Sequence, residues 1–106
     1  MRRFIRAALF AAALLAGSPA LAEDAAVSID NFTFSPAEIT VAAGTRITWT
    51  NNDDIPHTVV DADDPKAWKS PPLDTGDAWA RVFDKPGTYH YFCSLHSHMQ
   101  GTVVVR

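Results

Sequence analysis

The sequence predicts an all-β domain, built as an antiparallel sandwich or a small barrel. Apolar and polar residues alternate with a period of two in several short segments, turn-forming residues separate those segments, and none has a sustained helical period. About seven short strands in a domain of this size are typical of such folds.

The N-terminal residues are set apart from this domain because they have the pattern of a secretory signal. Arg2, Arg3 and Arg6 form a basic region, residues 7–16 form an apolar run, and Ala20-Leu21-Ala22 is a cleavage site of small residues. The run is shorter than the ~18–20 residues of a spanning helix, so a membrane anchor is the weaker interpretation. We expect a signal peptide over 1–22, cleavage after Ala22, a periplasmic location and one mature domain over 23–106.

The mature chain begins with an extended segment. Val27 and Ile29 alternate with polar neighbours, and Phe32 and Phe34 continue the alternation one register out. This pattern predicts one strand with a bulge or bend near Asn31.

Two more strands and an extended segment follow. Residues 39–41 and 46–50 alternate as half-buried strands on either side of a turn at 43–44. Residues 51–54 are all turn formers, and 56–60 resume an extended character.

The second half begins with a long surface loop over residues 61–77, where Asp64 and Pro65 predict at most one helical turn. Three strands then complete the domain, over residues 79–83, 88–93 and 103–105.

The charge and the cysteine content restrict the function. The formal net charge is −3, and it becomes −6 once the three arginines of the signal are removed. This argues against nucleic-acid binding, which needs a positive face. No segment after the signal is apolar enough to cross a membrane. A single cysteine makes no internal disulfide, so Cys93 is either a free thiol or bound to something, and a bound metal would stabilise so small a domain.

One short segment near the C-terminus collects soft and borderline metal ligands. Cys93, His96 and Met99 follow one another at three-residue spacing, and His57 adds a second imidazole after a turn. This set disfavours magnesium and calcium, which prefer oxygen ligands. Two histidines, a cysteine and a weak axial methionine are the pattern of copper in electron transfer.

Each of these residues also has an ordinary interpretation. Cys93 and Met99 are compatible with core packing, and His57 with a solvent-exposed loop position. His98 competes with His96 and Met99 for the metal, although we expect it to be exposed. His90 alternates with Cys93 on its strand and is expected at the surface.

The chain resembles a known family over nearly all of its mature length. It looks like a cupredoxin, a type 1 blue copper protein, of the plastocyanin type, and the Cys-x₂-His-x₂-Met spacing is similar to that of amicyanin. The resemblance rests on the segments at 31–39 (NFTFSPAEI), 43–52 (AGTRITWTNN), 55–59 (IPHTV), 85–93 (KPGTYHYFC) and 99–105 (MQGTVVV).

The resemblance implies an antiparallel Greek-key β-sandwich with one copper ion, cycling between Cu(I) and Cu(II), near one end. His57 would come from a loop, and Cys93, His96 and Met99 from the loop between the last two strands. Two positions depart from the family pattern. Leu95 stands where amicyanin-like loops usually carry proline, and Thr58 stands where an asparagine often ties the ligand loops together.

The implied function is a monomeric electron carrier that is not an enzyme. Its partners would be redox proteins, with an amine dehydrogenase as donor and a c-type cytochrome as acceptor. The expected docking surface consists of Ile55, Pro56, Leu95 and His98 around the edge of His96. The acidic residues are expected to form a solvated rim, and steering of a basic redox partner is the less favoured interpretation of them.

Two other functions use the same residues. The first is copper binding or delivery without redox turnover. The second is a thiol enzyme with Cys93 as nucleophile and a histidine as base, for which the sequence indicates neither a third orienting residue nor a substrate pocket.

Overall fold

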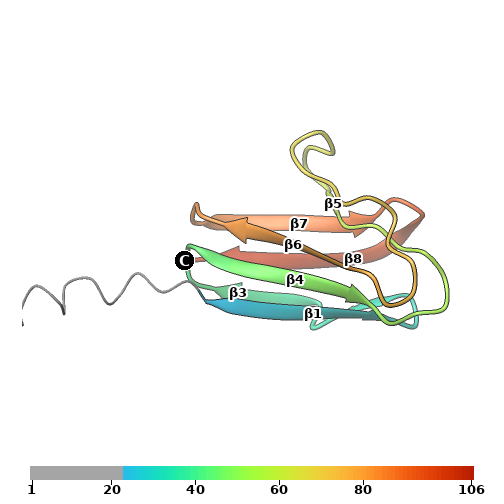
Figure 1. Ribbon diagram of the computed structural model, residues 1–106. Coiled ribbons are helices and arrows are strands. Elements are labelled where there is room, and N and C mark those ends of the chain that lie inside the picture. The colour runs from blue at the N-terminus through green and yellow to red at the C-terminus, as the bar shows by residue number, and fades with distance from the viewer. Residues whose placement is uncertain (1–22) are drawn as a thin grey trace, which may run out of the picture.

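Alternating apolar residues produce eight strands within residues 23–106, the part of the chain described by this computed structural model (Figure 1). The predicted signal peptide lies outside the described residues. The strands are β1 (Asp24–Asp30), β2 (Thr33–Ser35), β3 (Glu38–Val41), β4 (Thr45–Asn51), β5 (Val60–Asp61), β6 (Ala78–Phe83), β7 (Gly87–Cys93) and β8 (His96–Val105).

The strands form two four-stranded sheets, in the orders β2-β1-β4-β6 and β3-β8-β7-β5. The predicted all-β sandwich is confirmed, with one correction to its strand directions. The pairs β1–β4 and β3–β8 are parallel and the other pairs are antiparallel, so both sheets are mixed. A period of two identifies a half-buried strand but does not specify the direction of its partner, so alternation alone could not predict these parallel pairs.

The predicted bent strand around Asn31 is wrong, because the chain reverses there as a tight hairpin. Asn31 and Phe32 have φ angles of 52° and 56°, and they connect β1 to an antiparallel β2. Ile29 pairs with Phe34 across this hairpin, and both side chains are buried. The change of register in the sequence therefore marks a turn rather than a bulge.

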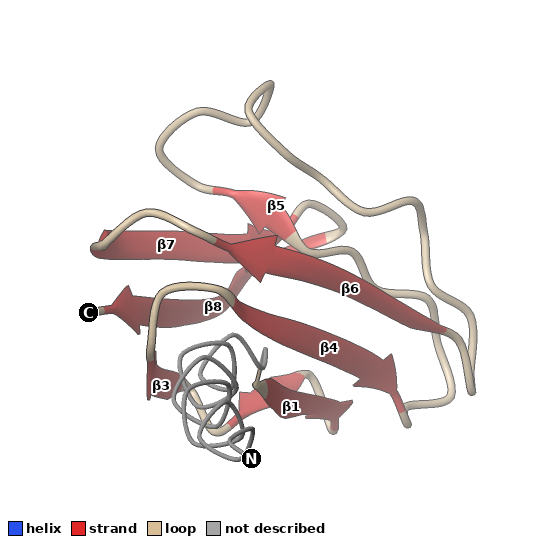
Figure 2. Cartoon of the chain, turned by 60° about the vertical axis from the view of Figure 1, so that its left-hand side comes forward, coloured by secondary structure: helices blue, strands red, loops and turns tan. Residues whose placement is uncertain are grey.

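Aromatic side chains fill the space between the sheets. Trp49 on β4 is fully buried. Its ring centroid lies 5.3 Å from that of Tyr91 and 6.4 Å from that of Trp68. Trp68 comes from the long loop that rises beside β5 and β6 (Figure 2). Instead of the helical turn predicted at Asp64, this loop contains a hydrogen-bonded turn, in which the Ala67 amide donates to the Asp64 carbonyl at 2.8 Å and the Asp64 carboxylate accepts the Lys66 amide at 3.1 Å. The loop therefore contributes an aromatic residue to the core.

The connections from β4 to β5 and from β7 to β8 lie at one end of the sandwich, away from the C-terminus (Figure 1). His96 and Met99 were expected in a loop, but both lie in a strand, because β8 begins at His96 rather than at Val103. Only Ser94 and Leu95 separate β7 from β8. Within residues 23–106, no helix has the length and apolar character needed to cross a membrane.

Candidate metal centre

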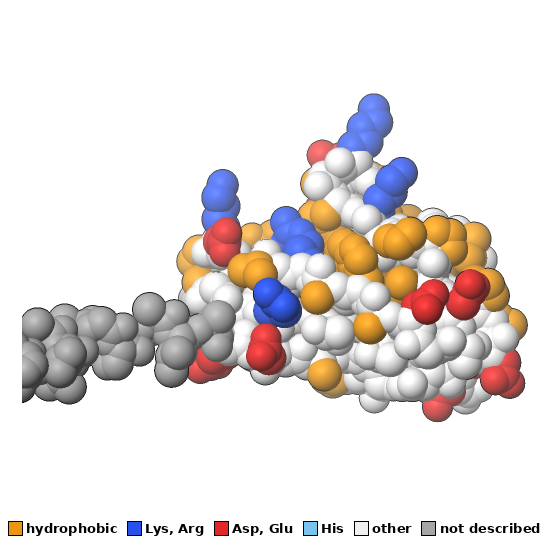
Figure 3. Space-filling model, viewed as in Figure 1, with side chains coloured by type: hydrophobic (Ala, Val, Ile, Leu, Met, Phe, Trp, Pro, Cys, Tyr) orange, Lys and Arg blue, Asp and Glu red, His pale blue; other side chains and the backbone are white. Residues whose placement is uncertain are grey.

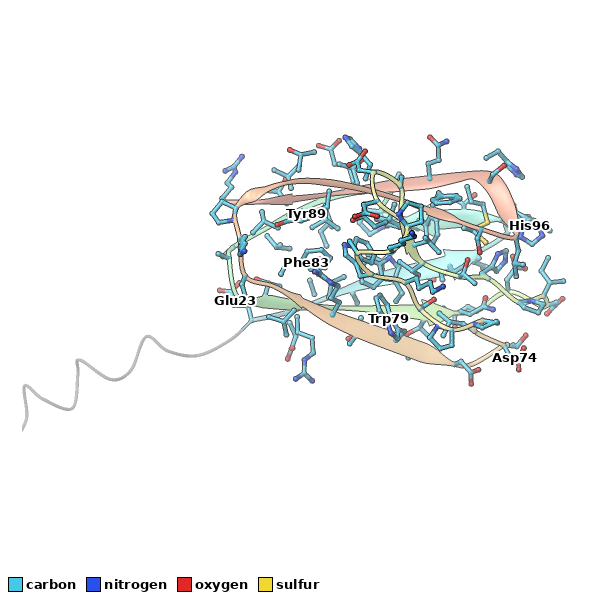
Figure 4. All side chains as sticks on the ribbon, turned by 90° about the horizontal axis from the view of Figure 1, so that it is seen from above. Glu23, Asp74, Trp79, Phe83, Tyr89 and His96 are labelled. Carbon is cyan, nitrogen blue, oxygen red and sulfur yellow. The ribbon has the colours of Figure 1, made fainter. Side chains whose placement is uncertain are left out.

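Three of the predicted ligands converge at this end of the sandwich. One donor atom each from His57, Cys93 and His96 lie within 4.8 Å of one another. The Nδ1 atoms of both histidines are 3.7 Å from the Cys93 sulfur. His57 and Cys93 are fully buried, whereas His96 is partly exposed. Figure 4 shows His96 at the end of the sandwich opposite Glu23. The three donors therefore form a compact group that is buried except for the partly exposed imidazole of His96.

The backbone around His57 is held by hydrogen bonds from two sides. His57 exchanges backbone bonds with Leu73, at 3.1 Å and 2.8 Å. The buried Asn51 amide donates to the carbonyls of Ile55 and Leu73, at 2.9 Å and 2.8 Å, and its oxygen accepts the Asp53 amide at 2.8 Å. Asn51 thus acts as a cross-link that shapes the loop before His57.

A carboxylate fixes the orientation of the His57 ring. His57 Nε2 lies 2.9 Å from Asp53 Oδ2, and the Phe32 amide donates to the same oxygen at 3.0 Å. The Phe32 amide, followed by His57, holds the pKa of Asp53 below its usual value. Because an ionised carboxylate only accepts hydrogen bonds, Nε2 carries the proton. Nδ1 is the nitrogen that faces the group of donors, 3.7 Å from the Cys93 sulfur, and in the neutral ring it has the lone pair that binds a metal.

The environment of Cys93 favours a thiolate. Burial acts to raise the pKa of this thiol, but the hydrogen bond from the Thr58 amide, followed by the neighbouring imidazoles of His57 and His96, lowers it to about 6. The Thr58 amide lies 3.4 Å from the sulfur. A thiolate is the form that binds metal, so the site presents a ready ligand near neutral pH.

Thr58 joins the two segments that carry the ligands. Its hydroxyl accepts the Ser94 amide at 2.8 Å and shares a second hydrogen bond of 2.8 Å with the Ser94 hydroxyl. The threonine that replaces the family's asparagine therefore ties the His57 segment to the turn after Cys93.

The remaining methionine and histidines differ in burial, since Met99 is buried and His98 and His90 are exposed. Met99 is 2% exposed and belongs to the same core cluster as Cys93. His98 is exposed and lies outside the group of three donors, as expected. His90 is also exposed, with Nδ1 3.3 Å from Thr102 Oγ1. Thus the Met99 side chain is buried, and within residues 23–106 neither the competing His98 nor the surface residue His90 belongs to the group of three donors.

This donor set fits copper. Two imidazoles and a thiolate, with a thioether on the adjoining strand, match the soft and borderline ligands that copper prefers, and no carboxylate takes part in the group. A sequence profile described as Cupredoxin-like domain matches residues 5–105. The chain belongs to the cupredoxin family. Copper is its cofactor, and the cluster of His57, Cys93, His96 and Met99 is typical of a type 1 copper site.

Relatives of this cupredoxin include amicyanins and plastocyanins. Amicyanin-alpha of Methylorubrum extorquens is 38% identical, over 93% of this chain and 86% of its own length. Plastocyanin of Scenedesmus fuscus is 34% identical, over 69% and 86% respectively. A novel purple cupredoxin from Nitrosopumilus maritimus has a similar structure, with a TM-score of 0.72, 35% identity, and coverage of 78% of this chain and all of that one. The relatives by sequence are thus small copper proteins rather than enzymes.

Three residues that contribute to the site were not predicted from the sequence to do so. Asn51 and Asp53 were assigned to a run of turn formers, and Phe32 to a strand. The available signal for Asp53 was its position four residues before His57, since a carboxylate often orients a metal-binding histidine. Phe32 had no such signal, because only the hairpin brings it to this end of the molecule.

Proposed function

We propose that this cupredoxin is a periplasmic electron carrier that transfers one electron at a time between redox partner proteins. His57, Cys93, His96 and Met99 would hold the copper, which would supply a one-electron couple. The observation that carries the proposal is the convergence of two Nδ1 atoms and one Sγ atom within 4.8 Å, at an end of the sandwich where one imidazole is partly exposed. A buried site with one exposed edge suits electron exchange with a docked protein.

The chain's own residues prepare this site before any partner arrives. Asp53 holds the His57 ring, the Thr58 amide donates to the Cys93 sulfur, and the Thr58 hydroxyl fastens the turn at Ser94. Bound copper supplies a one-electron couple, because thiolate and thioether favour Cu(I) while imidazole accommodates Cu(II). A frame held by these hydrogen bonds and two sheets keeps the ligands in one geometry, so little rearrangement accompanies a change of oxidation state.

The surface around His96 is suited to docking. Leu95 is 53% exposed and Phe32 41%, and Pro56 is also exposed beside the metal-binding end. Acidic side chains lie at this end of the molecule in Figure 3. We propose that an apolar contact centred on His96, surrounded by acidic groups, receives a redox partner with a basic rim. The resemblance to amicyanin favours an amine dehydrogenase as donor and a c-type cytochrome as acceptor.

The visible and EPR spectra of the copper-loaded protein test the proposal. We expect an intense visible band from thiolate-to-copper charge transfer, which a one-electron reductant bleaches reversibly. Cys93→Ser should fold and lose the band, whereas His98→Ala should retain it. A colourless or Cu(I)-only complex would instead support copper delivery. Because one similar protein is called purple, the absorption spectrum decides the result rather than a blue colour.

Cell fractionation tests the location. We expect the mature protein in the periplasmic fraction, with an N-terminus at Glu23 by mass spectrometry. Recovery of an uncleaved chain from the cytoplasm would contradict the export part of the proposal and leave the copper chemistry to be judged by the spectra.

A further inference from the structure

The hairpin between β1 and β2 has an unusual turn residue beside the metal centre. Both Asn31 and Phe32 have positive φ, at 52° and 56°. Two-residue turns of this kind normally place glycine at the second position, because a side chain there is strained. Phe32 is also 41% exposed, so burial in the core does not explain it. Strained residues of this sort often have a function, which directs attention to what Phe32 contacts.

The ring of Phe32 contacts both imidazoles of the candidate site. Its centroid lies 5.6 Å from that of His57, with the ring planes at 90°, and 5.0 Å from that of His96, with the planes at 84°. These are edge-to-face arrangements, which aromatic rings favour. The amide of Phe32 meanwhile donates to Asp53 Oδ2, the same oxygen that holds His57. One residue thus touches both histidines and supports the carboxylate of one of them.

His96 depends on this contact more than His57 does. Asp53 fixes the His57 ring through Nε2, but among residues 23–106 the only hydrogen-bond partner of the His96 ring is the Cys93 sulfur, through Nδ1. The chain before His96 carries Leu95, which restrains the backbone less than a proline would. Within the described part of the chain, the aromatic rings that pack on His96 are those of Phe32 and His57, with centroids 5.0 Å away in each case. Aromatic packing therefore restrains the ring plane of His96 where no second hydrogen bond does.

We propose that Phe32 is a positioning residue that fixes the ring plane of His96 and supports that of His57 for metal binding. This inference rests on the proposed function, because it assigns the positioning of two of its ligands to the β1–β2 hairpin. The strained turn persists because it directs a ring at both histidines and an amide at Asp53.

Four variants separate positioning from simple packing. Phe32→Leu and Phe32→Gly remove the ring, Phe32→Tyr retains it, and Val82→Ala removes part of an exposed apolar side chain on β6 as a control. Phe32→Gly should be more stable than Phe32→Leu, because glycine tolerates positive φ. We expect both ring-less variants to bind Zn(II), a redox-silent probe, about tenfold more weakly than the wild type, as loss of a group supporting metal ligands does. Phe32→Tyr and Val82→Ala should bind as the wild type does.

NMR of the metal-free protein gives a readout that does not depend on copper. The wild type should show cross-relaxation between the Phe32 and His96 rings, and the ring-less variants should shift the His96 ring signals. The inference is overturned if Zn(II) affinity is unchanged in both ring-less variants, or follows their stability rather than the presence of the ring. If those variants do not fold, absence of the Phe32–His96 cross-relaxation in the wild type overturns it. The visible spectrum of the wild type judges the proposed function separately.

Discussion

Among the glycines of residues 23–106, Gly101 is the one where an added methyl group would meet the least space. A Cβ atom there would lie 2.2 Å from Cζ of Tyr91 and 2.3 Å from its hydroxyl oxygen. Ordinary carbon contacts begin at about 3.5 Å, so the ring would have to move by more than about 1 Å. Tyr91 is 1% exposed and packs at 4.7 Å from Phe34 and 5.3 Å from Trp49, between ring centroids, so it has little room to move.

Two limits bracket the cost of Gly101→Ala. If the ring shifts but remains in the core, overpacking costs about 1–3 kcal/mol. If the ring is expelled, losing the burial of a tyrosine, some 150–250 Å², costs about 4–6 kcal/mol. A central value near 3 kcal/mol is a large part of the roughly 4–13 kcal/mol expected for a domain of this size, and would lower its Tm by roughly 12–24 °C.

Thermal and urea unfolding of the metal-free protein would measure this effect. Gln100→Ala, an exposed neighbour on the same strand, is the matched control and should change little. Tyr91→Leu combined with Gly101→Ala should recover part of the loss, because the smaller side chain leaves room for the methyl group. A Gly101→Ala protein with a Tm within a few degrees of the wild type, and with Tyr91 still packed on Trp49, would refute the reasoning.

Three further predictions concern the surroundings of the metal centre and the core. Asp53→Asn should weaken Zn(II) binding by about 10–100-fold, because the variant loses the group that orients a ligand histidine. Asp54→Asn is the exposed control. Equal Zn(II) affinity in the two variants would contradict the role given to Asp53. Thr58→Val should cost about 1–3 kcal/mol in urea unfolding, because the Ser94 amide loses its acceptor, and an unchanged unfolding midpoint would argue against the tie. Burial raises the pKa of Tyr91 to about 12, so the unfolded chain releases this proton first and stability should fall as the pH rises above 10. Tyr91→Phe should lessen that fall, measured as Tm against pH, and an identical profile would exclude Tyr91 as its cause.

The alternation of apolar and polar residues was sufficient to predict the all-β class of the fold. Alternation predicted the strands at 46–50, 79–83 and 88–93, each within about two residues of its structural bounds. The same alternation does not reveal strand direction, so the parallel pairing of β1 with β4 was not predicted. It also did not separate a bulge from a hairpin at Asn31, because both shift the register of the apolar residues by one.

The candidate ligands were predictable because their chemistry is rare and their spacing is short. Cysteine, histidine and methionine three residues apart form a pattern visible without any structure. The residues that orient those ligands carry no such pattern. Asn51, Asp53 and Phe32 are common residue types, and each acquires its role only through contacts formed when the β4–β5 and β1–β2 connections meet at one end of the sandwich.

The sequence by itself determined the donor set, and hence the preference for copper over oxygen-binding cations, because softness belongs to the side chains themselves. Only the tertiary structure decided which nitrogen of His57 faces the sulfur and what lowers the pKa of Cys93. It also decided that Phe32 stands against both imidazoles. These properties depend on distances of 3–6 Å between segments far apart in the chain, and such distances exist only once the two sheets have packed.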